Sequence, residues 1–213
     1  MRHYIIKLTV FLLVTIPGYS VLAQPYTPVI SAAAFKTLFA AKSASILTLK
    51  CDFIQEKSIS MLQHKINSSG SFIYKKNNKL RMEYIKPYPF LFILDNDKVI
   101  IENDRRTSSV SASSNKMYQV ISKMTLDCFT GNVLNSNEFS VIVSENTQVY
   151  YLQLVPRQKM LRSLFDKIQI LISKSDFTVD RIELNETSGD TTILMFSNKR
   201  INAQVNDDVF KVN

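Results

Sequence analysis

The stretch GSFIYKKNNKLRMEY, residues 70–84, holds two runs of alternating apolar and polar residues on either side of an Asn77-Asn78 pair. Alternation with a period of two is typical of a β-strand with one buried face, and adjacent asparagines favour the tight turn of a hairpin. We therefore predict an antiparallel hairpin whose strands run from Ile66 to Lys75 and from Leu80 to Ile85.

The same alternation continues along most of the chain on both sides of this hairpin. Further strands are predicted around Leu49–Phe53, at Phe90–Leu94, Lys98–Glu102, Phe139–Ser144, Val149–Val155, Phe165–Ser173, Val179–Asn185 and Thr191–Ser197, with a short one ending at Val212. About ten or eleven antiparallel strands with two or three helices in one domain indicate a strongly curved sheet or barrel. The run FLFIL at residues 90–94 is apolar on both faces, so both faces of that strand must be covered.

Two segments have the helical period instead. Within the alanine-rich stretch from Tyr26 to Ile46, Phe35, Leu38 and Phe39 are spaced as on one face of an amphipathic helix. A second pattern, Met117, Val120, Ile121 and Met124, predicts a helix that ends near Gly131. The serine-rich residues 107–115 between these patterns have no apolar period, and we predict a loop there.

The first 23 residues have the three regions of a signal peptide. Arg2 and Lys7 precede an apolar run from Leu8 to Ile16, which is too short for a membrane anchor. Compact residues precede a cut between Ala23 and Gln24. No cysteine follows the cut to accept a lipid, so we expect a soluble periplasmic protein whose residues 24–213 form a single domain.

The chain is moderately basic, with 26 Lys and Arg against 18 Asp and Glu and a formal charge of +8. Such a charge suits nucleic acid, anionic lipid or an acidic protein. Export argues against nucleic acid, and the basic residues are scattered. The densest group, at residues 75–81, is interpreted as the guarded edge of a strand.

Cys51 and Cys128 enter an oxidising compartment, where a disulfide between them is possible. However, Cys51 alternates with Leu49 and Phe53 on the buried face of a predicted strand, and a buried free thiol is an ordinary core residue. Two free thiols are therefore the favoured interpretation.

The residues that catalysis needs are scarce. His64 is the one histidine of the mature chain, and no strand-turn-helix nucleophile motif or zinc-ligand spacing accompanies it. Gly70, Gly131 and Gly189 do not form a phosphate-binding loop. We predict a non-enzymatic protein with no cofactor and no metal.

Several segments taken in order resemble the periplasmic outer-membrane lipoprotein carrier family, the LolA-like proteins. The resemblance covers nearly all of the mature chain and is carried by residues 53–55, 70–76, 79–84, Pro87, 151–156, the strand pair around Ile168 and Ile182, residues 188–192, and Phe210. It implies an unclosed antiparallel β-barrel with helices that lid an apolar cavity. It also implies a function: the cavity of a monomer takes the acyl chains of acylated lipoproteins from an inner-membrane ABC transporter and passes them to an outer-membrane acceptor.

The resemblance also implies which residues would bind the chains. The family usually has an arginine where Lys76 stands, and that arginine holds the lid. Lys76 is therefore the expected lid latch; it keeps the positive charge but lacks the planar guanidinium that can donate two hydrogen bonds at once. Tryptophan is usual in the family where this chain has Met82. With strand alternation, the expected acyl-binding residues are Phe53, Phe72, Tyr74, Leu80, Met82, Tyr84, Phe90 and Phe92 from the sheet, and Met117, Ile121 and Met124 from the lid.

Two other functions fit the same residues. One is the binding of a different amphiphile on the same fold, such as a glycolipid or a polyketide pigment. The other is an interaction protein of the envelope, in which the apolar residues fill a core and leave no cavity.

Overall fold

The computed structural model describes residues 25–62, 64–103, 106–111 and 116–212, with the side chains of residue 106 and residues 116–121 excepted. The predicted signal peptide and its cleavage site lie outside these residues. Within them, the chain forms one antiparallel sheet of twelve strands in the order β1-β8-β9-β10-β11-β12-β2-β3-β4-β5-β6-β7. The two edge strands, β1 and β7, are not paired with each other, so the barrel is unclosed as predicted.

The elements follow the sequence pattern closely. The strands are β1 (Thr27–Pro28), β2 (Thr48–Ser58), β3 (Lys65–Lys75), β4 (Lys79–Lys86), β5 (Phe90–Asp95), β6 (Lys98–Asn103), β7 (Arg106–Ser111), β8 (Phe139–Glu145), β9 (Val149–Pro156), β10 (Phe165–Ser173), β11 (Val179–Glu186) and β12 (Thr191–Ile201). The helices are α1 (Ala32–Ala44), α2 (Lys116–Thr130), α3 (Lys159–Arg162) and the 3-10 turns η2 (Asn132–Asn135) and η3 (Asp207–Phe210).

The hairpin predicted from residues 70–84 is β3–β4. Asn77 and Asn78 both adopt positive φ angles, 71° and 58°, which is the conformation that a tight hairpin turn with right-handed strand twist requires. The strands approach closely at Gly70, where an added Cβ would lie 1.9 Å from the carbonyl oxygen of Glu83. A side chain at Gly70 would therefore push β4 away from β3.

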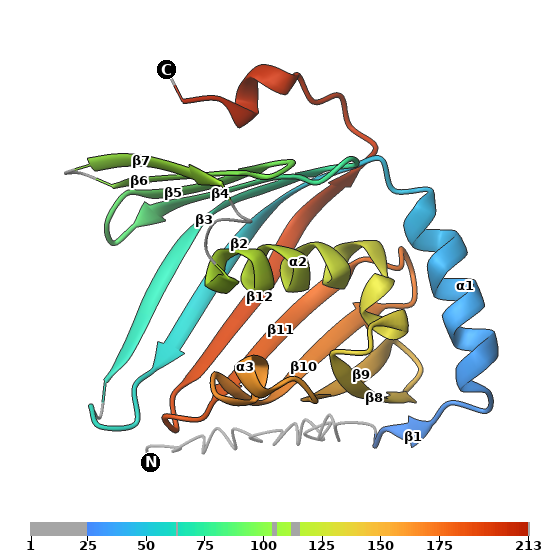
Figure 1. Cartoon of the computed structure of the whole chain (residues 1–213). Helices are drawn as coiled ribbons and strands as arrows, with labels where there is room; N and C mark the ends of the chain where they lie inside the picture. The colour runs from blue at the N-terminus through green and yellow to red at the C-terminus, as the bar shows by residue number, and fades with distance from the viewer. Residues whose placement is uncertain (1–24, 63, 104–105, 112–115, 213) are drawn as a thin grey trace, which may run out of the picture.

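The sheet curves strongly, and its two faces are covered by different parts of the chain (Figure 1). Helix α2 lies across the concave side, and α1 stands beside it. The C-terminal segment lies on the convex side over β4–β6, where Val205 and Phe210 pack against Leu91, Ile93 and Ile100. This explains why the run at residues 90–94 is apolar on both faces.

Three predictions about elements are corrected by the structure. The first helix begins at Ala32, with the side chain of Ser31 accepting from the Ala34 amide as its N-cap, and residues 27–28 before it pair with β8 instead. The serine-rich segment is a strand through Ser111, because backbone pairing with β6 needs no apolar side chains. The segment ending at Val212 holds the helical turn η3 rather than a strand.

Both cysteines are free and buried, which agrees with the favoured interpretation. Cys51 lies on the concave face of β2, and Cys128 lies near the end of α2. Burial raises the pKa of each thiol to about 12.

Candidate functional site

The concave face of β3, β4 and β5 carries three cross-strand rows of apolar side chains. Tyr74, Leu80 and Leu94 form the first row, Phe72, Met82 and Phe92 the second, and Gly70, Tyr84 and Phe90 the third. The first row is fully buried, whereas Met82, Phe92, Tyr84 and Phe90 are half-buried. The apolar face therefore becomes more accessible towards the Tyr84–Phe90 end.

The structure brings together the described residues that the sequence singled out. Phe53, Phe72, Tyr74 and Leu80 are buried in the main core, and Met82, Tyr84 and Phe92 pack against them. Met124 joins the same core from α2, while the side chains of Met117 and Ile121 lie outside the described residues. Phe90 contacts the set through Tyr84, with ring centroids 5.6 Å apart.

We call α2 the lid helix, because its apolar side chains cover the fully buried part of this face. The Phe129 ring stacks on Phe72 at 4.6 Å between centroids and meets the edge of Phe196 at 5.5 Å. Cys128 and Met124 lie in the same core. The lid helix therefore fills the buried part of the concave face, and an apolar ligand has to displace these side chains to bind there.

Helix α1 packs where the lid helix ends. Gly131 follows the lid helix with φ of 78°, and an added Cβ would meet the Phe39 ring at 3.1 Å and the Ser43 hydroxyl at 3.0 Å. The left-handed conformation favours glycine here, and a Cβ would also need Phe39 and Ser43 to shift by a few tenths of an ångström. This junction fixes the C-terminal end of the lid helix, whereas its other end follows residues 112–115.

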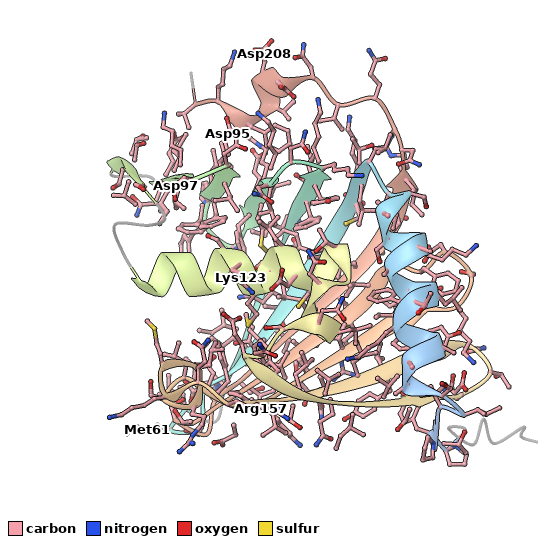
Figure 2. The ribbon with its side chains drawn as sticks, turned by 45° about the vertical axis from the view of Figure 1, so that its right-hand side comes forward. Met61, Asp95, Asp97, Lys123, Arg157 and Asp208 are labelled. Carbon is pink, nitrogen blue, oxygen red and sulfur yellow. The ribbon has the colours of Figure 1, made fainter. Side chains whose placement is uncertain are left out.

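The lid helix carries a small charge cluster that includes the buried Asp127. The Lys123 ammonium lies 2.6 Å from Asp127 Oδ2 and 3.3 Å from Glu138 Oε2, so it links the lid helix to the start of β8. Figure 2 shows Lys123 on this helix and Asp97 on the β5–β6 turn above it. Burial raises the pKa of Asp127, and the nearby Lys123 opposes that rise.

The accessible end of the apolar face also has polar groups. The Tyr84 hydroxyl donates to Gln55 Oε1 at 2.8 Å, and burial raises the pKa of Tyr84 to about 12. Lys57 follows Gln55 by two residues along β2 and therefore lies on the same face of the strand. Its ammonium forms an ion pair with Glu186 Oε1 at 3.1 Å. An amphiphile at this end would find apolar side chains inside and charged groups at the rim.

Lys76 is exposed and lies in the β3–β4 turn. Its ammonium donates to the carbonyl of Ala44, the last residue of α1, at 3.3 Å, and its amide donates to the Leu47 carbonyl at 2.8 Å. The residue expected as a latch thus contacts α1 and the segment after it.

Some residues of the covered face were missed by sequence reasoning. Cys128 continues the Met117, Ile121, Met124 period by one more turn of helix, so the pattern could have revealed it. Phe129 and Phe196 had no comparable signal, because their meeting depends on the position of the lid helix on the sheet.

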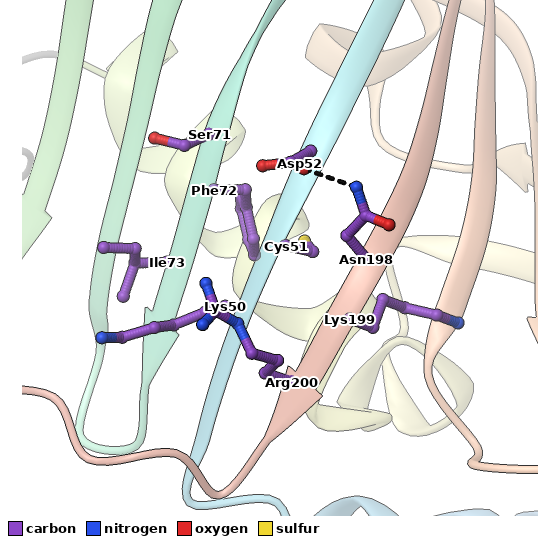
Figure 3. A pocket seen from close by; sticks show the side chains of 9 residues that line it. All are labelled: Lys50, Cys51, Asp52, Ser71, Phe72, Ile73, Asn198, Lys199 and Arg200. Carbon is purple, nitrogen blue, oxygen red and sulfur yellow. Dashed lines mark hydrogen bonds between the residues drawn. The ribbon is translucent and has the colours of Figure 1, made fainter.

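A separate hollow of about 570 Å³ lies on the convex face, at a bulge of β12 between Ser197 and Arg200 (Figure 3). Asn198 donates to Asp52 at 2.7 Å across this hollow. Arg200 pairs in register with Lys50, so two cations lie opposite each other on neighbouring strands. The hollow is also lined by Phe72 and Ile73, so charged and apolar side chains share its walls.

In the described part of the chain, no helix combines the length and hydrophobicity needed to cross a membrane.

The chain is similar to one family model and to several solved structures. The family model described as outer membrane lipoprotein carrier protein LolA matches residues 44–213. An uncharacterized conserved protein of Thermus thermophilus superposes with a TM-score of 0.52 at 10% identity, over 86% of this chain and 94% of that chain. A LolA superfamily protein of Nitrosomonas europaea gives a TM-score of 0.43 at 10% identity, over 83% of this chain and 97% of that chain.

The lipoprotein LppX of Mycobacterium tuberculosis gives a TM-score of 0.44 at 11% identity, over 82% of this chain and 97% of that chain. No curated protein matches the chain significantly. At these identities the structural similarities concern the fold alone.

Proposed function

Because the chain belongs to the outer membrane lipoprotein carrier protein family, we propose that it carries the acyl chains of lipoproteins through the periplasm on the concave face of its sheet. The observation that carries the proposal is the graded burial of the three apolar rows, which run from a sealed core to a half-buried end. That end is the proposed entrance for an acyl chain.

Binding requires the lid helix to move. The acyl chain of the ligand would take the place of Phe129, Met124 and Cys128 against the sheet. The sheet thus exchanges its apolar contact with the lid helix for apolar contact with the ligand. This exchange keeps the concave face away from water in both states. The empty carrier is thereby protected from aggregation through a large exposed apolar surface.

The energetics favour transfer by direct contact. Each methylene moved from water into an apolar site gains roughly 0.8 kcal/mol, so a sixteen-carbon chain gains on the order of 12 kcal/mol before the cost of moving the lid. Release into water is then too slow to be useful. Loading from a bilayer gains almost nothing, which is why the proposal includes an energised inner-membrane ABC transporter as donor and an outer-membrane acceptor.

Lys76 is proposed to strengthen the closed state. Its contact with the C-terminal carbonyl of α1 ties the β3–β4 turn to the helix that packs at the end of the lid helix. Loss of this contact would weaken the packing of α1 against the C-terminal end of the lid helix, which is the end about which the lid helix would rotate to open.

The non-binding alternative is also supported by an observation, since the lid helix fills the buried part of the concave face. A tripalmitoylated lipopeptide and the same peptide without acyl chains separate the two functions. The carrier function predicts that the protein binds only the acylated peptide and keeps it soluble. A protein that binds neither peptide supports the alternative function, in which the apolar residues form a structural core and bind no ligand.

Matched variants locate the binding site. Met82 is half-buried in the middle row of the concave face, so Met82→Asp is expected to abolish binding of the acylated peptide. Ile54 is half-exposed and lies on the convex face of β2, so Ile54→Asp should leave binding unchanged. Equal binding by the two variants would place the acyl chains elsewhere.

A further inference from the structure

The hollow on the convex face, which we call the convex hollow, spans three neighbouring strands, β12, β2 and β3 (Figure 3). Arg200 on β12, Lys50 on β2 and Ile73 on β3 form one cross-strand row along it. Asp52 and Ser71 lie opposite each other in the next row. These rows place two cations, a carboxylate, a hydroxyl and an apolar side chain on one face of the sheet.

Lys50 and Arg200, which we call the cation pair, have no counter-ion among the described residues. Neither side chain forms an ion pair or a hydrogen bond within that part of the chain. Like charges directly opposite each other on neighbouring strands destabilise a sheet. An anion bound between the two side chains would replace this repulsion with attraction.

The bulge of β12 decides which cation faces Lys50. If the register before the bulge continued, Lys199 would lie opposite Lys50. The extra residue puts Arg200 there instead, and Lys199 extends away towards the β10–β11 turn, where its ammonium lies 3.3 Å from Asp176 Oδ2 (Figure 3). A bulge can re-aim a side chain in this way. The bulge therefore supplies the convex hollow with an unpaired guanidinium and directs the paired ammonium elsewhere.

The carboxylate of Asp52 does not neutralise the cation pair. It accepts a hydrogen bond from the amide of Asn198 at 2.7 Å and forms no ion pair with a described residue. Since Lys199 is paired with aspartates outside the convex hollow, the two cations of the pair exceed this one carboxylate. The convex hollow thus keeps a positive excess beside donors that have no described acceptor.

These donors suit a phosphate ester. A guanidinium donates two parallel hydrogen bonds to phosphate oxygens, and an ammonium can donate to a third oxygen at the same time. A single carboxylate has only two oxygens for both cations. Ile73 lies opposite Lys50 and offers an apolar wall to the organic part of the ester. A volume of about 570 Å³ has room for that part as well as for the phosphate.

We propose that the convex hollow binds the phosphate group of a phosphate ester between Arg200 and Lys50. Membrane phospholipids and soluble phosphate esters both carry this group. The inference goes beyond the proposed carrier function and does not rest on it, because the convex hollow and the acyl-binding rows lie on opposite faces of the sheet. A phospholipid head group bound here would hold the convex face against a bilayer and leave the concave face free to exchange its chain.

The first test compares sn-glycerol 3-phosphate with glutarate at pH 8 and constant ionic strength. Both probes carry two negative charges there, because the second pKa of a phosphate monoester is about 6. The amide resonances of residues 50–52, 71–73 and 198–200 report binding by NMR and locate it. We expect the phosphate ester to bind at least about fivefold more tightly, as one further charge-assisted hydrogen bond implies.

Two double variants with the same change of net charge provide the control. Lys50→Gln with Arg200→Gln removes the cation pair and should fold at least as stably as the wild type, because it relieves the repulsion. Lys167→Gln with Arg157→Gln removes a half-buried lysine and an exposed arginine that do not line the convex hollow. Only the first variant should lose the preference for the phosphate ester, and both should bind a fluorescent fatty acid as the wild type does.

Vesicles of phosphatidylglycerol identify the source of the phosphate. If the ligand is a bilayer head group, the variant without the cation pair should sediment with these vesicles several-fold more weakly than the control variant. If the ligand is a soluble ester, the two variants should sediment alike while the preference for glycerol 3-phosphate still depends on the cation pair.

Two results would overturn the inference. Equal affinity of the wild type for glycerol 3-phosphate and glutarate would show a cationic surface without selectivity for phosphate. A phosphate preference that survives without the cation pair, or that the control variant loses to the same extent, would place the binding site elsewhere.

Discussion

Phe129→Ala should make the protein bind acyl chains more tightly. The Phe129 ring is the aromatic contact between the lid helix and the sheet, through Phe72 and Phe196. Each such ring pair contributes about 0.5–1.5 kcal/mol beyond its buried area, so the variant should destabilise the closed lid by about 2 kcal/mol. That energy corresponds to a roughly 30-fold shift towards the open state.

Apparent affinity equals intrinsic affinity multiplied by the open fraction, so a lid that opens more readily binds more tightly. Part of the gain is lost because the bound chain no longer contacts the Phe129 ring. We therefore expect the dissociation constant of a fluorescent fatty acid to fall on the order of tenfold. Titration at equal protein concentrations measures this change. The reactivity of the Cys128 thiol, which the lid helix itself carries on its buried side, should rise in parallel.

Phe210→Ala is the control for loss of stability. Phe210 is as deeply buried as Phe72, but it packs on the convex face under the C-terminal segment. Both phenylalanine variants should lower the free energy of unfolding by about 3–5 kcal/mol. Only Phe129→Ala should change binding. The idea of a lid that competes with the ligand would be refuted if Phe129→Ala folds, binds no more tightly than the wild type and keeps Cys128 protected.

Three further predictions follow from described contacts. Cys51 and Cys128 should react with a thiol reagent at pH 8 on the order of a thousandfold more slowly than an ordinary cysteine, because a pKa of about 12 leaves little thiolate. Rapid reaction of the native protein would contradict their burial. Lys76→Leu should tighten fatty-acid binding, but by no more than about fivefold, since its contact is exposed; weaker binding would end its role as a latch. Arg200→Glu should place a negative charge on β12 opposite Lys50 on β2 and raise the free energy of unfolding, measured by urea denaturation, by about 0.2–1 kcal/mol. A decrease would show that the two cations do not repel each other in the native sheet.

The hairpin at residues 70–84 shows what the sequence could predict. Alternation along β3 and β4 identified the strands, their turn and the side chains that share the concave face, because each strand has one buried side and one solvated side. The same reasoning failed for β7, an edge strand whose serine-rich side chains carry no apolar period. Its pairing depends on backbone hydrogen bonds that side-chain patterns do not encode.

The candidate site was predictable only in part for a similar reason. The residues of the concave face could be listed from periodicity, and the half-buried and fully buried members could not be told apart. That distinction depends on where the lid helix crosses the sheet, as the Phe129–Phe72 contact illustrates.

Mass spectrometry of lipid extracted from the purified mature protein shows most directly whether the concave face carries acyl chains. We expect acylated molecules that leave the protein when excess fluorescent fatty acid is added and that are missing from Met82→Asp prepared in parallel. A wild-type protein that yields no lipid and binds no fluorescent fatty acid would contradict this expectation, and would identify the filled concave face as a structural core.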